Sequence, residues 1–167
     1  MRAKFDQRIL YIALVALLIF ISFLVYSIFF ASTEIKLYFS DQQAQYLEAE
    51  FRTIKDKNLY ESSIKELIAG PKNEELSATL PSDIQLLGIE VSDGLAEVDF
   101  NQDLIRFHSG GSTGERMTVY SIVNTLAQFE EIQRVQILIE GEIKETLVGH
   151  LDISQPIEYN KRIVDNL

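Results

Sequence analysis

The chain has 167 residues, enough for one domain with a substantial core but short for two. Its 25 acidic and 15 basic residues give a net charge of −10, and an acidic surface repels nucleic acid phosphates, so we expect no nucleic-acid partner. The sequence contains no cysteine, which excludes a disulfide scaffold, a thiol nucleophile and a zinc–thiolate site.

An uncharged apolar run extends from Ile9 to Ala31. As a helix it is roughly 34 Å long, slightly more than the roughly 30 Å hydrocarbon core of a bilayer. Signal peptidase needs a small residue three positions before its cut, and Phe29 occupies that place for a cut after Ala31. The run therefore predicts an uncleaved transmembrane anchor rather than a secretory signal.

The flanking charges predict the orientation of this anchor. Arg2, Lys4 and Arg8 precede the run, whereas only Lys36 follows it closely. Because basic residues stay on the cytoplasmic side, we expect a single-pass protein of the bacterial cell membrane with a cytoplasmic N-terminus. The predicted division is a cytoplasmic segment 1–8, a transmembrane anchor 9–31, an extracytoplasmic domain 32–157 and a C-terminal tail 158–167.

The first half of the outer domain predicts two strands and a helix. Apolar and polar residues alternate over 35–39, and a second strand is expected over 46–54. A helix follows over 59–69, with Asn58 and Glu61 as its N-terminal capping pair.

The second half predicts a hairpin, a long helix and a further strand. The dipeptide Asp93-Gly94 between two alternating runs is a strong hairpin signal. The expected elements are strands 87–91 and 96–100, a helix with an apolar stripe over 119–129, a strand 135–139 and a short return strand within 143–148. This order predicts an α+β two-layer sandwich, with a mixed or antiparallel sheet and two main helices on one face, after the transmembrane helix.

The stretch FHSGGSTGERMT raises the question of a phosphate loop, because Gly110, Gly111 and Gly114 precede the long helix. A P-loop needs a lysine after its last glycine, and here Glu115 stands where phosphate charge would lie. We interpret Ser112 and Glu115 instead as a capping box that begins the helix.

No other motif predicts catalysis, a metal or a cofactor. The histidines, His108 and His150, lack metal-ligand spacing. A calcium loop over Asp99, Asn101 and Asp103 would lack its glycine and its bidentate glutamate. The serines near the glycine stretch, Ser109, Ser112 and Ser121, have no nucleophile-elbow context.

Three polar residues interrupt the apolar stripe of the long helix: Asn124, Thr125 and Gln128. Exposure to solvent is the default interpretation for such residues. The alternatives are a polar contact within the domain or a contact with a partner protein, and we retain them as candidate partner contacts.

The ordered segments resemble the GerMN domain family of sporulation and germination proteins. They are LIAGP, LPSDIQLLGIEVSDGLAEVDFNQDL, GGSTGERMTVYSIVNTLAQF, VQILIEGE and GHLDISQPI, which together cover about 35–157. The resemblance implies an extracytoplasmic, non-catalytic interaction domain that serves envelope or membrane-complex proteins, with self-association into a higher oligomer as one form. The chain departs from the family pattern by having one such domain instead of a tandem pair, and an apolar anchor instead of a lipoprotein cysteine.

The competing class is a cell-envelope polysaccharide binder, or a hydrolase acting on the wall. A hydrolase needs acids that converge in a cleft, so clustering of His108, Asp99 and Asp103 would favour it. A sugar binder needs exposed aromatic rings, for which the candidates are Tyr38, Tyr46 and Tyr159.

Overall fold

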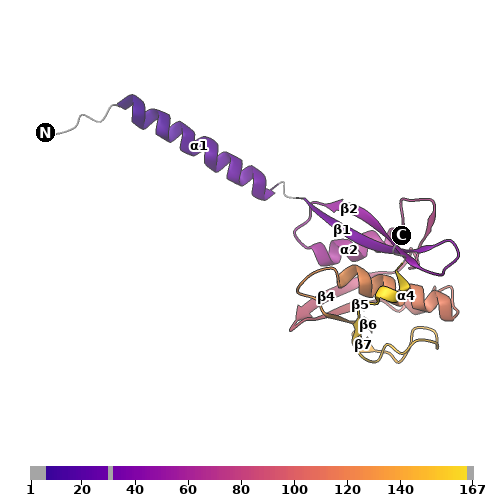
Figure 1. Ribbon diagram of the computed structural model, residues 1–167. Coiled ribbons are helices and arrows are strands. Elements are labelled where there is room, and N and C mark those ends of the chain that lie inside the picture. Colours follow the sequence, from indigo (N-terminus) through magenta and orange to yellow (C-terminus); the bar gives the residue numbers. More distant parts are fainter. Residues whose placement is uncertain (1–6, 30–31, 165–167) are drawn as a thin grey trace. The chain divides into compact units, whose positions relative to one another are not determined.

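The computed structural model describes residues 7–29 and 32–164, which belong to two separate compact units (Figure 1). The first unit contains helix α1, Gln7–Phe29. Within it, Gln7–Leu24 is long and apolar enough to cross a membrane, and none of this window is buried. The predicted apolar run is thus helical, although residues 30–31 lie outside the described residues, as do 1–6 and 165–167.

The second unit, which begins at Glu34, contains two β-sheets. The first sheet has the order β2–β1–β3, with β1 Thr33–Asp41, β2 Leu47–Ile54 and β3 Leu76–Ser77. The second has the order β4–β5–β6–β7, with β4 Leu86–Ser92, β5 Leu95–Phe100, β6 Arg134–Ile139 and β7 Glu142–Ile143, and β8 Ile157–Glu158 also pairs with β6.

Two main helices lie between the sheets, as Figure 1 shows. They are α2, Leu59–Ile68, and α4, Ser112–Leu126, and α2 packs against both α4 and β4. The predicted α+β class is confirmed. The strands nevertheless divide into two sheets instead of the single sheet expected, so the helices are covered on two sides. A one-turn helix, α3 (Asp103–Arg106), and a 3₁₀ turn, η1 (Lys161–Ile163), complete the described elements.

The second sheet is mixed because α4 forms a crossover connection. β4 and β5 are antiparallel and joined by the predicted turn, in which Asp93 has φ 49° and Gly94 has φ 78°. Both central residues of a type I′ turn need positive φ, which explains the Asp-Gly pair. β5 and β6 are parallel, with Leu95 opposite Arg134, and a parallel pair requires such a helical crossover.

The core fills the space between the sheets and the helices. β1, β5 and β6 each direct alternate apolar residues inward, and α4 supplies its predicted stripe. The fully buried contributors include Leu37, Phe39, Val98, Phe100, Ile122, Leu126, Ile137 and Ile139. The helices and sheets are therefore held by one continuous apolar cluster.

The C-terminal segment is part of this unit rather than a loose tail. β8 pairs with β6, and Val164 forms a bridge to Leu47 at the start of β2. Ile163 is 5% exposed and packs with Tyr38 and Met117 on the outer side of β1. One short segment thus contacts both sheets.

Candidate functional site

The predicted capping box at the start of α4 is wrong. Ser112 is the first helical residue, and the N-cap is Gly111, which makes no side-chain capping bond. Gly111 has φ 78° and follows Gly110 at φ 81°, a conformation that glycine adopts without strain. The Glu115 carboxylate is not available for capping because it bonds the backbone of residues 147–151.

Glu115 is a fully buried acid that organises a distant loop. It is 0% exposed, and its two oxygens accept four backbone hydrogen bonds. Oε1 accepts from the N–H groups of Leu147 (2.8 Å) and Val148 (2.9 Å). Oε2 accepts from those of His150 (2.8 Å) and Leu151 (3.2 Å). A buried carboxylate requires such donors, so loop 147–151 and Glu115 depend on each other.

His108 ties the glycine stretch to α4. Its Nδ1 accepts from the N–H of Gly110 at 2.9 Å, so Nε2 carries the proton in the neutral ring. The hydroxyl of Thr118 donates to the carbonyl of Thr79 at 2.5 Å, and therefore accepts from Nε2 at 3.0 Å. Burial lowers the pKa of His108, while the charge of Glu115 acts in the opposite direction.

The acids that a hydrolase would use do not join His108. The pocket beside His108 has a volume of about 170 Å³, and neither Asp99 nor Asp103 lines it. Asp99 instead accepts from the N–H of Gly141 at 3.0 Å, and Asp103 accepts from the amide of Asn101 at 2.8 Å. Within residues 7–29 and 32–164, no group of three acids or histidines is placed to hold a metal ion.

The default of solvent exposure is wrong for Asn124 and Thr125, whereas Gln128 is half-buried and lies just beyond the end of α4. Asn124 and Thr125 are 0% exposed. Thr125 Oγ1 accepts from the N–H of Tyr38 at 3.2 Å, and Gln128 bonds both the N–H and the carbonyl of Lys36 at 2.8 Å. These side chains occupy the edge of β1, where a neighbouring strand would otherwise bind.

Asn124 has an equivalent role at the C-terminal segment. Its side chain accepts from the N–H of Asn160 at 2.9 Å and donates to the carbonyl of Asn160 at 3.2 Å. Asn124, Thr125 and Gln128 thus each bond backbone groups within the domain, which is one of the two alternatives that the sequence leaves open.

The other predicted capping pair lies at the start of α2. Asn58 is the N-cap, and its side chain accepts from the N–H of Glu61 at 3.3 Å. The carboxylate of Glu61 does not return to Asn58, because it pairs with Lys65 at 2.8 Å. The capping bond of Asn58 and the ion pair of Glu61 thus both stabilise the first turns of α2.

A free strand edge remains on the first sheet. β2 is the terminal strand, and its only described neighbour beyond β1 is the bridge from Leu47 to Val164. Ala49, Phe51 and Thr53 are exposed along it, and Phe51 is 57% exposed. An exposed strand with an unpaired edge and an aromatic side chain is suited to pairing with another chain.

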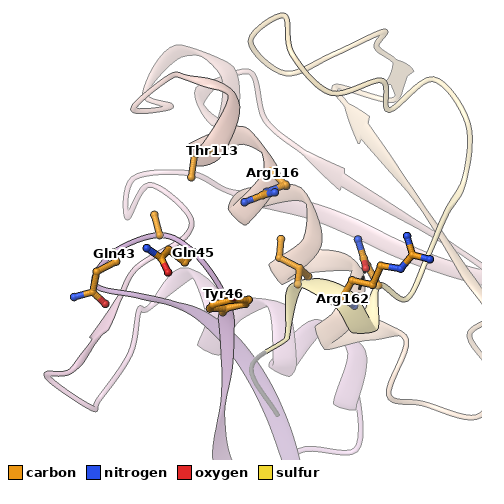
Figure 2. A pocket seen from close by; sticks show the side chains of 9 residues that line it. Gln43, Gln45, Tyr46, Thr113, Arg116 and Arg162 are labelled. Atoms are coloured by element: carbon orange, nitrogen blue, oxygen red, sulfur yellow. Dashed lines mark hydrogen bonds between the residues drawn. The ribbon is translucent and has the colours of Figure 1, made fainter. Parts of the chain in front are cut away.

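A cleft that no sequence motif predicts lies between the β1–β2 turn, the start of α4 and the C-terminal segment (Figure 2). Its volume is about 690 Å³. It is lined by Gln43, Ala44, Gln45, Tyr46, Thr113, Arg116, Asn160, Arg162 and Ile163. Of the three aromatic candidates, Tyr46 lines it, whereas Tyr38 is buried and Tyr159 is exposed outside its lining. The lining residues come from three distant segments, so only the folded chain brings them together.

Comparisons with solved structures place the fold. The structure of the first GerMN domain of the sporulation protein GerM from Bacillus subtilis matches with a TM-score of 0.66 and 25% identity, covering 75% of this chain and 97% of that one. The tandem GerMN domains of the same protein match with a TM-score of 0.66 and 24% identity over 77% of this chain. This chain spans less than half of that tandem structure, 46%.

A putative lipoprotein from Clostridium perfringens also matches, with a TM-score of 0.57 and 28% identity, covering 82% of this chain and 93% of that one. A comparison with curated proteins gave no significant match. Residues 36–145 match the Germane family, described as sporulation and spore germination. This match covers most of the second unit, from β1 through β7, and the chain therefore belongs to the Germane family.

Proposed function

We propose that the chain is a membrane-anchored, extracytoplasmic interaction module that acts by binding other envelope proteins without catalysis. The single observation that carries the proposal is the free edge of β2 with its exposed Phe51. Family membership supports a role in a sporulation or germination envelope complex.

The anchor in this proposal is α1, and the charges around it set the orientation. Arg8 lies in the first turn of α1, and every residue after it in this helix is uncharged. Basic residues are retained in the cytoplasm, which assigns the second unit to the outside. Anchoring confines the unit to one membrane face and raises its effective concentration for partners there.

The lack of cysteine allows a direct test of this topology. A single cysteine introduced as Gln155→Cys, at an exposed position of the second unit, should react with a membrane-impermeant maleimide on intact cells. The matched variant Lys4→Cys should react only after the cells are permeabilised. The reverse pattern would refute the orientation.

The two edges of the first sheet differ in a way that favours β2 as the contact strand. Gln128 and Thr125 fill the edge of β1 beside α4. No corresponding side chain among the described residues bonds the outer edge of β2 between Ala49 and Thr53. An extended segment of a partner would add there as a further strand, with backbone hydrogen bonds giving affinity and Phe51 giving a side-chain contact.

The groups that would perform catalysis are engaged elsewhere, which supports a non-catalytic role. The ring nitrogens of His108 bond Gly110 and Thr118. Asp99 holds the turn at Gly141, and Asp103 bonds Asn101. Each of these side chains stabilises a local loop.

The test is photo-crosslinking in native membranes. A photoreactive phenylalanine at position 51 should capture an envelope protein or a second copy of the chain. The same group at position 107 is the control, because Phe107 is 51% exposed on a loop outside the first sheet. The absence of any protein adduct at position 51, or the same adduct at both positions, would refute the proposal.

A further inference from the structure

The cleft in Figure 2 has a charge that contrasts with the rest of the chain. The chain carries a net charge of −10, yet the lining of the cleft contains two arginines and no acidic residue. The described ion pairs use Arg52, Lys65, Arg106 and Lys144, and within this part of the chain neither Arg116 nor Arg162 pairs with a carboxylate. Two guanidinium groups in one cleft, neither with a carboxylate partner among residues 7–29 and 32–164, attract an anion.

The position of Arg116 makes it the central cation of the cleft. It lies one helical turn after Thr113 on α4, and both side chains border the cleft. Figure 2 shows Arg116 extending from α4 toward Gln45, whereas Arg162 lies at the opposite end. The neighbouring acid, Glu115, does not neutralise this cation by pairing, because its oxygens bond loop 147–151.

The remaining lining groups are those that recognise a sugar. Gln43 and Gln45 offer side-chain amides that both donate and accept hydrogen bonds, and Thr113 offers a hydroxyl. Tyr46 is 44% exposed, and Figure 2 shows its ring beneath Gln45 and Arg116. An aromatic face with an apolar body and a polar tip fits the apolar side of a saccharide ring. The volume of about 690 Å³ admits one or two sugar units.

We propose that this cleft binds an anionic saccharide, with Arg116 pairing with a carboxylate or phosphate group and Tyr46 contacting the sugar ring. A guanidinium forms paired, charge-assisted hydrogen bonds with either anion, so both sources share one chemistry. The proposal adds a glycan-binding activity to the protein-binding role, and it uses a different surface from the β2 edge.

The test is binding of defined probes to the full chain in detergent micelles, measured by calorimetry. The probes are trigalacturonic acid as a carboxylated saccharide, glucose 6-phosphate as a phosphorylated one, maltotriose as a neutral one, and pentaglutamate as an acidic peptide. We expect at least one anionic saccharide to bind more tightly than maltotriose and pentaglutamate. Its preference between carboxylate and phosphate identifies the anion.

The variants separate the two parts of the site. Arg116→Gln should weaken binding of the anionic saccharide by about tenfold or more, through the loss of a charge-assisted pair. Arg134→Gln is the matched control, because Arg134 is exposed on β6 and does not line the cleft. Tyr46→Ala should weaken saccharide binding while leaving the charge of the cleft intact. All three side chains are exposed, so the thermal unfolding midpoint should change little.

Several results would overturn the proposal. One is equal binding of maltotriose and the anionic saccharides, and another is an equal effect of Arg116→Gln and Arg134→Gln. Tighter binding of pentaglutamate than of any sugar would make the cleft a site for acidic peptides, and no binding of any probe would remove it as a site. None of these results bears on crosslinking at position 51.

Discussion

The substitution Glu115→Gln tests the dependence of loop 147–151 on one buried carboxylate. The carboxylate accepts four backbone hydrogen bonds, two at each oxygen. Glutamine is nearly the same size but keeps only one acceptor oxygen. Its amide group would face two backbone N–H donors, so one of the two pairs of bonds is lost whichever way the amide is oriented.

The expected cost follows from these lost bonds. A hydrogen bond to a charged group contributes about 1.5–3 kcal/mol, so the loss of two places the destabilisation at about 3–6 kcal/mol. A domain is stable by roughly 5–15 kcal/mol, and the substitution therefore removes a large share of the free energy of unfolding. Because Glu115 is 0% exposed, water cannot replace the lost acceptor.

The assay is urea unfolding of the full chain in detergent micelles, followed by the near-ultraviolet circular dichroism of its tyrosines. Hydrogen exchange should show lost protection at the amides of Leu147, Val148, His150 and Leu151. Glu75→Gln is the control, because Glu75 is exposed and should change stability by less than about 0.5 kcal/mol. A Glu115→Gln variant as stable as this control would refute the reasoning.

Three further predictions concern local contacts. Burial lowers the pKa of His108 in the folded chain below the ordinary histidine value of 6.5. Below pH 6.5 the unfolded chain therefore binds a proton more readily than the folded one, and the free energy of unfolding should decrease as the pH falls. Unfolding curves at several pH values should show this decrease in the parent chain and a weaker one in His108→Gln. Thr125→Val should cost about 1–3 kcal/mol by leaving the N–H of Tyr38 buried without an acceptor, whereas Gln128→Ala should cost less because water reaches Lys36; denaturant titration orders the two. Gly94→Ala should lower the unfolding midpoint in calorimetry, because φ is 78° and the added Cβ would lie 3.2 Å from Gln133 Cδ; an unchanged midpoint would contradict this account.

The elements that the sequence predicts well are those set by neighbouring residues. The β4–β5 hairpin is an example, because the turn at Asp93-Gly94 and the alternation on each side are local. The start of α2 at Asn58 is another, since the capping bond spans three residues. The α+β class follows from the order of such elements.

The features that the sequence does not predict depend on partners far along the chain. Gln128 meets Lys36 across 92 positions, and Glu115 meets Leu147 across 32. Periodicity gives a helix its buried side but does not identify what a polar residue on that side will contact. The prediction of a single sheet is wrong for the same reason. Strand pairing is non-local, and no local signal separates β1–β3 from β4–β8.

The candidate cleft could not be predicted either, because its lining residues are far apart in the sequence. Gln45, Arg116 and Arg162 come from a turn, a helix and the C-terminal segment, and none belongs to a motif. The sequence suggests only that Tyr46 is one of three aromatic rings suited to a sugar. What distinguishes the site is the local excess of positive charge, which appears once the three segments are folded together.

The bridge of Val164 to β2 and the pairing of β8 with β6 mean that the last segment to be synthesised contacts both sheets. Ribosomes add about 5–20 residues per second, so the chain between Ile139 and Val164 takes roughly one to five seconds to appear. Throughout that interval both sheets lack the segment that joins them. Anything that meets the nascent protein then, whether a chaperone or a second nascent copy, encounters an edge of β6 that β8 covers in the finished molecule.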